Sequence, residues 1–158
     1  ILKRTSLMAG NPHLLIVEAR FYDDIADELV RGAIARIEAA GGTYERVEVP
    51  GAFEIPGAID LAIRGAGIGG RKPFDGYVAL GCVIRGETTH YDYVCTESAR
   101  GLQDLVLRYG ASIGYGILTV ENRDQAWARA SVEKDDKGGF VANAALRMIE
   151  LKSHFGLS

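Results

Sequence analysis

The sequence predicts an α/β protein of three layers, with a four-stranded parallel sheet between two layers of helices. Four short apolar runs that suit strands alternate along the chain with segments whose apolar residues recur at helical spacing. This alternation favours right-handed crossovers, and therefore a parallel sheet with helices on both faces. The chain of 158 residues is long enough for one sizeable core, so we expect a single domain over residues 1–158.

The first half of the chain is predicted to supply two strands and two helices. Residues 1–12 are expected to form an arm, since a chain end is rarely ordered unless it docks on something. Apolar residues at helical spacing run from Ile25 to Ile37, until Gly41-Gly42 ends the helix. The predicted elements are a strand at 14–17, this helix, a strand at 44–49 that Pro50-Gly51 ends, and a helix at 54–64 with Pro56 in its first turn.

The second half follows a glycine-rich loop at residues 65–73. The apolar run at 77–80 suits a strand that is buried on both faces. The predicted elements are a strand within 74–83, a helix at 90–109, a strand at 113–120, a helix at 123–130, a polar break at 135–139 and a closing helix at 140–151.

Composition and charge exclude several classes of protein. Hydrophobic residues make up 47% and charged residues 25% of the chain, as in a globular protein in water. The net charge of −3 with no basic run argues against nucleic acid, and no apolar run approaches the ~20 residues that cross a bilayer. We see no secretory signal. Cys82 and Cys95 fall in predicted core elements, which indicates reduced thiols in a cytoplasm, and three scattered histidines predict no metal site.

Residues 81–94, GCVIRGETTHYDYV, contain the strongest candidate for a site. They indicate the end of a strand, a polar turn with Gly86, and the start of a helix with Thr88 and Thr89 as candidate N-caps. A helix N-terminus offers N–H groups and a partial positive charge, which suits a phosphate. His90, in the first turn, is then the candidate proton-transfer group. The alternative is ordinary capping beside a surface histidine.

Parallel sheets bind ligands beyond the carboxyl ends of their strands, and three more candidates follow strands here. Phe21 suits stacking on a flat heterocycle, or else only packs at the start of a helix. Glu54 either accepts hydrogen bonds from a polyol or complements the helix dipole. Arg129 suits pairing with a phosphate, unless it is only a solvated side chain. These residues alone predict a flavodoxin-like domain that binds a small phosphorylated or heterocyclic ligand.

Five motifs in register resemble the lumazine synthase family. They are PGAFEIP at 50–56, GCVIRGETTHYDYV at 81–94, GILTVEN at 116–122, DQAWARA at 124–130 and KGG at 137–139. The resemblance covers nearly the whole chain. It implies condensation of 5-amino-6-(D-ribitylamino)uracil with 3,4-dihydroxy-2-butanone 4-phosphate to 6,7-dimethyl-8-ribityllumazine, with loss of phosphate and water, as the penultimate step of riboflavin synthesis. It also implies that no metal or organic cofactor takes part.

The resemblance assigns roles to residues at matching positions. His90 takes the proton-transfer role, and Phe21 stacks on the pyrimidine. The other pyrimidine and ribityl contacts are Ala52, Phe53, Glu54, Cys82, Val83, Ile84 and Tyr115, of which Tyr115 reaches over from a neighbouring subunit. The phosphate contacts are Gly86, Glu87, Thr88, Arg129 and Lys137.

Four positions depart from the pattern of the family: Glu87, Cys82, Tyr115, which is often Phe, and Ala128, which replaces a residue that is often acidic. Glu87 stands where a small residue is common, and a carboxylate repels a bound phosphate, so we expect its side chain to point away while its N–H donates. Cys82 varies in the family and is expected to contact the ring through its backbone. The alternative to the synthase is a non-catalytic flavin- or lumazine-binding or shell-forming paralogue. His90, Thr88 and Arg129 favour the enzyme, because a pure binder has no need of His90.

The resemblance further implies a homo-oligomer whose active sites lie between neighbours in a five-fold ring. The arm at 1–12 is then expected to pair beside a neighbouring sheet. Shell-forming relatives tend to carry a Gly-Asn-Lys-Gly run in the bend between the last two helices, whereas this bend, residues 131–138, is charged and has no glycine before Gly138. Residues 132–134 resist backbone angles that glycine permits, and charges at a contact cost desolvation, so we expect a free pentamer rather than a sixty-subunit shell.

Overall fold

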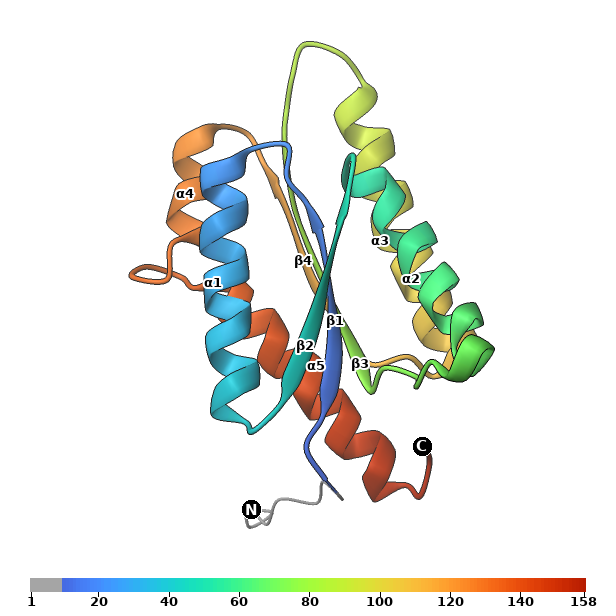
Figure 1. Ribbon diagram of the computed structural model, residues 1–158. Helices are drawn as coiled ribbons and strands as arrows, with labels where there is room; N and C mark the ends of the chain where they lie inside the picture. Colours follow the sequence, from blue (N-terminus) through green and yellow to red (C-terminus); the bar gives the residue numbers. More distant parts are fainter. Residues whose placement is uncertain (1–9) are drawn as a thin grey trace.

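The structure is a computed structural model that describes residues 10–158 (Figure 1). Its strands form one all-parallel sheet in the order β2-β1-β3-β4, which confirms the predicted α/β class and matches a flavodoxin-like order without the fifth strand. The strands are β1 (His13–Ala19), β2 (Thr43–Val49), β3 (Gly76–Ile84) and β4 (Ile113–Val120). The helices are α1 (Asp23–Ala39), α2 (Ile55–Gly65), α3 (His90–Tyr109), α4 (Arg123–Ala130) and α5 (Lys137–His154), with short 3-10 helices η1 (Ala52–Glu54) and η2 (Ile68–Gly70).

The sheet has a buried centre and two exposed edges. In β1 every residue after His13 is buried, and the first six residues of β3 are buried too, as expected for strands covered on both faces. The edge strand β2 is mostly exposed, and the other edge strand, β4, exposes Tyr115 and Thr119. The apolar centre therefore holds the fold together, while the two edges remain open.

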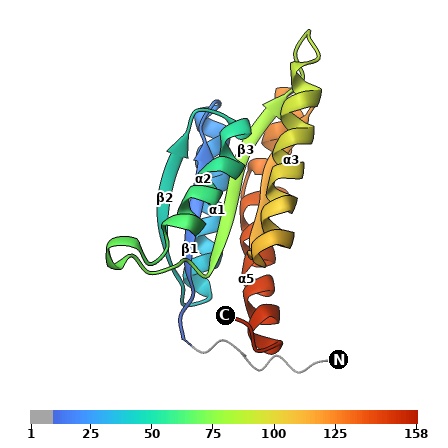
Figure 2. The ribbon, with the colours of Figure 1, turned by 90° about the vertical axis from the view of Figure 1, so that its right-hand side faces the viewer.

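Two separate cores lie on the two faces of the sheet. Helices α1, α4 and α5 cover one face, and their apolar residues, such as Leu29, Ala126 and Val141, pack with Leu14 and Ile16 of β1. Helices α2 and α3 cover the other face. There Ile55 and other apolar residues pack against the strand side chains that point away from α1, α4 and α5. Figure 2, turned by 90° from Figure 1, shows α2 and α3 in front of the sheet. The predicted three-layer architecture is confirmed.

The structure corrects the polar break that the sequence predicts at residues 135–139. Helix α5 begins at Lys137, not at residue 140, because the side chain of Asp136 caps it by accepting from the N–H of Gly139 at 3.2 Å. Gly138 and Gly139 are therefore helical. A Cβ at Gly138 would lie 1.9 Å from the carbonyl oxygen of Leu29, so this glycine allows α5 to approach α1 closely.

Elsewhere the differences are small. A 3-10 turn, η1, precedes the second helix, which begins at Ile55 rather than at Glu54, and the bounds of α3, β4 and α4 are as predicted. Residues 1–9 of the predicted arm lie outside the described residues, and Pro12 at its end accepts a backbone hydrogen bond from Thr43 at 2.9 Å. Within residues 10–158, no helix is both long enough and apolar enough to cross a membrane.

Candidate active site

The carboxyl ends of the four parallel strands meet along one rim of the sheet, at the top of Figure 1. The segments that leave this rim are residues 20–22 after β1, 50–54 after β2, 85–89 after β3 and 121–122 after β4. Loop 85–89 rises beyond the others in Figure 1. Because all four strands run in one direction, segments that are far apart in the sequence come to the same end of the molecule.

His90 lies at the rim as the first residue of α3. The N-cap residue, Thr89, makes no side-chain hydrogen bond to the helix, and the hydroxyl of Thr88 accepts only a long bond of 3.4 Å from the N–H of His90. Residues 85–90 are exposed, including the carboxylate of Glu87. The positive end of a 20-residue helix thus faces solvent beside an imidazole, an arrangement that suits an anion and a proton transfer.

Phe21 follows β1 and presents its ring to solvent. Its side chain is 74% exposed and touches Tyr22 edge to face, with ring centroids 5.0 Å apart. The preceding residue, Arg20, is fixed by the buried carboxylate of Glu18, at 3.0 Å, and by Asp27. A rigidly anchored segment with an open aromatic face is suited to stacking on a flat ring.

Residues 52–54 form η1, which packs against α3. Ala52 is buried in the α2–α3 core, whereas Phe53 is 58% exposed and Glu54 is exposed. The carboxylate of Glu54 lies near Gly51, where an added Cβ would come within 3.2 Å of Oε2. One anchored alanine therefore holds an aromatic and an acidic side chain at the rim.

The last residues of β3 alternate between the two faces of the sheet. The side chains of Cys82 and Ile84 pack on the core under α1, and that of Val83 packs on the core under α2 and α3. Burial raises the pKa of the Cys82 thiol to about 11, despite the nearby charge of Arg123, which acts in the opposite direction. The thiol is therefore neutral near pH 7, so it is no candidate for a nucleophile.

Three of the predicted site residues lie away from this rim. Arg129 is exposed near the end of α4, where Nη1 donates to the carbonyl oxygen of Gln125 at 3.1 Å. Lys137 begins α5, with its Nζ 4.6 Å from the centre of the Phe140 ring. Tyr115 lies opposite Ala79 in mid-strand and is 42% exposed; it precedes the end of β4 by five residues, or roughly 17 Å at 3.3 Å per residue.

The predicted residues therefore separate into two groups within one chain. We call the residues around the strand ends the rim group; they are Phe21, Ala52, Phe53, Glu54, Cys82, Val83, Ile84, Gly86, Glu87, Thr88 and His90. We call Tyr115, Arg129 and Lys137 the β4-side group. Figure 1 shows α4 and the start of α5 across the sheet from α2 and α3. A single chain therefore keeps Arg129 and Lys137 apart from the rim group, while Tyr115, whose neighbours include Tyr91 and Cys95, lies on the α3 face of the sheet below the rim.

Arg85 is a rim residue to which the sequence assigned no role. Its Nε lies 2.9 Å from Oε2 of Glu121, and its Nη1 lies 3.4 Å from Oδ1 of Asp92. Its guanidinium carbon lies 4.2 Å from the centre of the Tyr91 ring. Arg85 stands inside the GCVIRGETTHYDYV motif, but the carboxylate of Glu121 is 36 residues away in sequence, and only the fold reveals the pair.

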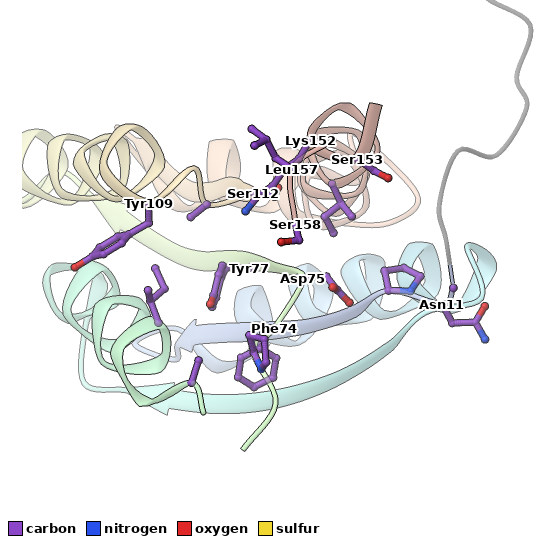
Figure 3. A pocket seen from close by; sticks show the side chains of 17 residues that line it. Asn11, Phe74, Asp75, Tyr77, Tyr109, Ser112, Lys152, Ser153, Leu157 and Ser158 are labelled. Atoms are coloured by element: carbon purple, nitrogen blue, oxygen red, sulfur yellow. The ribbon is translucent and has the colours of Figure 1, made fainter. Parts of the chain in front are cut away.

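A hollow of about 490 Å³ lies at the opposite end of the molecule (Figure 3). Its lining includes Tyr77 near the start of β3, Tyr109 at the end of α3 and Lys152 near the end of α5. None of the predicted site residues lines it. Because ligands of parallel sheets bind beyond the carboxyl ends, its place at the amino ends makes it a weaker candidate than the rim.

Comparison with known proteins identifies a family. A family model described as 6,7-dimethyl-8-ribityllumazine synthase matches residues 11–153. The chain is 60% identical over 144 residues to "6,7-dimethyl-8-ribityllumazine synthase 1" of Rhizobium meliloti (strain 1021), covering 91% of this chain and 94% of the relative. It is 59% identical over 147 residues to the 6,7-dimethyl-8-ribityllumazine synthase of Agrobacterium fabrum, covering 93% and 99% of the two chains. A relative of the same name from Bartonella henselae is 56% identical over 144 residues, covering 91% and 90%.

Proposed function

The chain belongs to the 6,7-dimethyl-8-ribityllumazine synthase family, and we propose that it carries out this synthesis at the rim of its sheet, in a site that a second copy of the chain completes. The substrates are 5-amino-6-(D-ribitylamino)uracil and 3,4-dihydroxy-2-butanone 4-phosphate, and the products are the lumazine, phosphate and water. The motifs quoted above stand in register with this family, and the relatives span almost the whole chain.

The open N-terminus of α3, with His90 as its first residue, is the observation that carries the proposal. The backbone N–H groups of Gly86, Glu87 and Thr88 bind the phosphate of the ketone, supported by the helix dipole. The exposed Glu87 carboxylate stays in solvent, away from that anion. His90, as the first residue of α3, lies within one helical turn of this proposed phosphate site, which supports its role as the proton-transfer group for the reacting carbonyl.

The rim group orients the pyrimidine. Phe21 stacks on the ring, and the backbone at residues 82–84 contacts its edge. The exposed carboxylate of Glu54 accepts hydrogen bonds from ribityl hydroxyls beside Phe53. The amine of the pyrimidine attacks the ketone and loses water to give an imine, phosphate is eliminated, and the second nitrogen closes the ring on the remaining carbonyl with loss of a second water. Each step moves protons, which suits a histidine, and holding two substrates together is worth ~7–11 kcal/mol of the barrier.

The β4-side group serves the rim of the neighbouring copy. Arg129 has no carboxylate partner among residues 10–158, so its guanidinium is available to a phosphate. Tyr115 exposes its ring on an open sheet edge, and the rim aromatics of each chain are more than half exposed. A homo-oligomer that joins the β4 edge of one chain to the rim of the next brings both groups to one ligand. The unpaired thiols of Cys82 and Cys95 support a reducing cytoplasm.

Complementation between two defective chains tests the shared site. His90→Ala removes a rim residue and Arg129→Ala a β4-side residue, so each variant alone has low activity. When the two are unfolded, mixed in equal amounts and refolded together, about one quarter of the sites receive both intact residues if assembly is random. The rate of lumazine formation, followed by absorbance, should recover to about one quarter of the rate of the unsubstituted protein.

The matched control is a mixture of His90→Ala with Phe21→Ala. Both residues belong to the rim group, so every mixed site lacks one of them, and no activity returns. If the His90→Ala and Arg129→Ala mixture also stays inactive, the two residues act within one chain and the shared site is wrong. Lumazine formation by the unsubstituted chain tests the reaction itself.

A further inference from the structure

Arg85 joins three segments of the rim. It lies in the loop between β3 and α3, and its backbone N–H donates to the carbonyl oxygen of Val120, the last residue of β4, at 2.9 Å. Its side chain contacts Glu121 after β4, and it contacts Tyr91 and Asp92 in the first turn of α3. Tyr91 and Asp92 directly follow His90 in the sequence.

Four other arginines on this surface make only local pairs, whereas Arg20, Arg36, Arg46 and Arg123, like Arg85, join separate segments. Arg31, Arg64, Arg100 and Arg147 pair with carboxylates three or four residues away on their own helices. Such pairs lie within one helix and do not connect separate segments of the chain. Arg85 instead connects a strand end, a loop and a helix start, so it constrains how these segments lie relative to each other. Its side chain is 41% exposed, which makes its contribution to global stability small.

The charges of this cluster also matter for an anion. Asp92 and Glu121 are carboxylates beside the loop that is suited to phosphate, and Arg85 pairs with both. With the arginine present, the negative charge of the two carboxylates is compensated. Without it, the two carboxylates stand uncompensated near the proposed anion site and repel a phosphate.

We propose that Arg85 is a positioning residue for the synthase reaction, which fixes the first turn of α3 against the end of β4 and so places His90 and the 86–88 loop. This role rests on the proposed function of the rim. Arg85 acts through its bonds to Glu121, Asp92 and Tyr91, and does not touch the substrate. A misplacement of about 1 Å in an active site costs up to ~100-fold in rate, so the loss of one exposed clamp is expected to lower kcat about tenfold.

The comparison of Arg85→Ala with Glu121→Gln separates a positioning role from direct phosphate binding. If Arg85 positions the turn, both variants lower kcat, and the double variant is no slower than the slower single variant. If Arg85 is instead a phosphate ligand, Glu121→Gln releases the arginine, so activity is unchanged or the KM for the phosphorylated ketone falls. That result, or strict additivity of the two losses, would overturn the proposal.

Two further readouts exclude a merely structural explanation. Arg85→Lys keeps the charge but cannot reach both carboxylates as a fork, so it is expected to restore the KM for the phosphorylated ketone and only part of kcat. The control is Arg100→Ala, which removes an exposed arginine with two carboxylate partners, Glu97 and Asp104, further along α3. It should leave both kcat and the melting temperature unchanged.

Amide hydrogen exchange keeps this test separate from that of the proposed function. Arg85→Ala should speed exchange at residues 86–92 and leave the rest of α3 unchanged, whereas Arg100→Ala should not affect residues 86–92. Unchanged exchange at residues 86–92 in Arg85→Ala would contradict the positioning role even if the wild-type chain makes lumazine. Absence of lumazine from the wild-type chain would instead count against the function.

Discussion

Glu18→Gln is expected to weaken the fold at the point where β1 leads into the rim. Glu18 is 3% exposed, and its oxygens accept two hydrogen bonds of 2.8 Å from Arg46 on β2 and one of 3.0 Å from Arg20. Arg20 in turn pairs with Asp27 of α1. This buried carboxylate therefore ties the edge strand β2, the segment that carries Phe21, and α1 to one point.

The loss of unfolding free energy depends on how Arg46 and Arg20 are compensated once the Glu18 carboxylate is gone. Breaking a buried ion pair by removing one partner costs about 3–5 kcal/mol, because the other charge is left buried without compensation. Here the Arg46 side chain is 45% exposed and regains water, and Arg20 keeps its pairs with Asp23 and Asp27. We therefore expect the lower end of that range, about 3 kcal/mol, which is a large share of a typical stability of ~5–15 kcal/mol.

The pH dependence of the unfolding free energy is a second, independent test of the role of Glu18. Burial alone raises the pKa of Glu18, but the hydrogen bonds and charges of Arg46 and Arg20 outweigh it and hold the pKa below its ordinary value of 4.5. A carboxylate with a lowered pKa in the folded state stabilises the fold above pH 4.5 and loses that effect as the pH falls through the folded pKa. The difference in unfolding free energy between wild type and Glu18→Gln is therefore largest at pH 7 and becomes smaller as the pH falls below 4.5.

Urea unfolding, followed by the fluorescence of the single tryptophan, Trp127, measures this difference. Protein concentration must be held fixed, because assembly contributes to apparent stability. Glu45→Gln is the control, since that carboxylate lies on β2 but is 61% exposed. This substitution should leave the unfolding free energy almost unchanged. Equal unfolding free energies for wild type and Glu18→Gln at pH 7, or a difference that does not vary with pH, would refute the reasoning.

The other expected outcomes concern the site and the assembly. His90→Ala lowers kcat but leaves residual turnover, because substrate positioning survives; unchanged kcat would remove His90 from the mechanism. Arg129→Ala raises the KM for the phosphorylated ketone far more than that for the pyrimidine, and equal rises would indicate a folding defect. Phe21→Ala weakens a ribityl-pyrimidine inhibitor by ~1–3 kcal/mol in calorimetry, and undiminished binding would contradict stacking. Analytical ultracentrifugation should show a pentamer, whereas a particle of shell size would show that bend 131–138 permits closure.

The sequence predicted those elements best that have clear ends. Helix α3 is capped by Gly110, which takes the left-handed conformation, and α4 is capped by Asn122, whose side chain accepts from the N–H of Gln125. Both signals are local, so they can be recognised in the sequence without knowledge of the fold. The start of α5 was missed because Gly138 weakens a helix on propensity alone, and its reason for being glycine is the carbonyl of Leu29 on a distant helix.

The sequence proposes candidate residues for the site but not their arrangement. The motifs name His90 and Arg129 equally well, yet nothing in the spacing of the chain says that α4 and α3 cover opposite faces of the sheet. That separation comes from the crossover connections and the strand order. The Arg85 cluster escaped notice for the same reason, since Glu121 belongs to another strand end.

The structure also changes the physical argument for the assembly. The sequence argument held that residues 132–134 resist the angles that glycine allows, but within residues 10–158 the one non-glycine residue with positive φ is Asp136, at 45°. Asp tolerates this conformation, and here its carboxylate caps α5 and pairs with Arg36 at 3.4 Å. The bend of this chain therefore turns without a glycine and without positive φ at residues 132–134, so the strain expected there is absent from it. What remains is the exposed charge of residues 133–135, whose desolvation at a contact is costly and whose repulsion between copies is screened by salt. A barrier of this kind predicts that high ionic strength, rather than a glycine substitution, is what shifts pentamers toward larger assemblies.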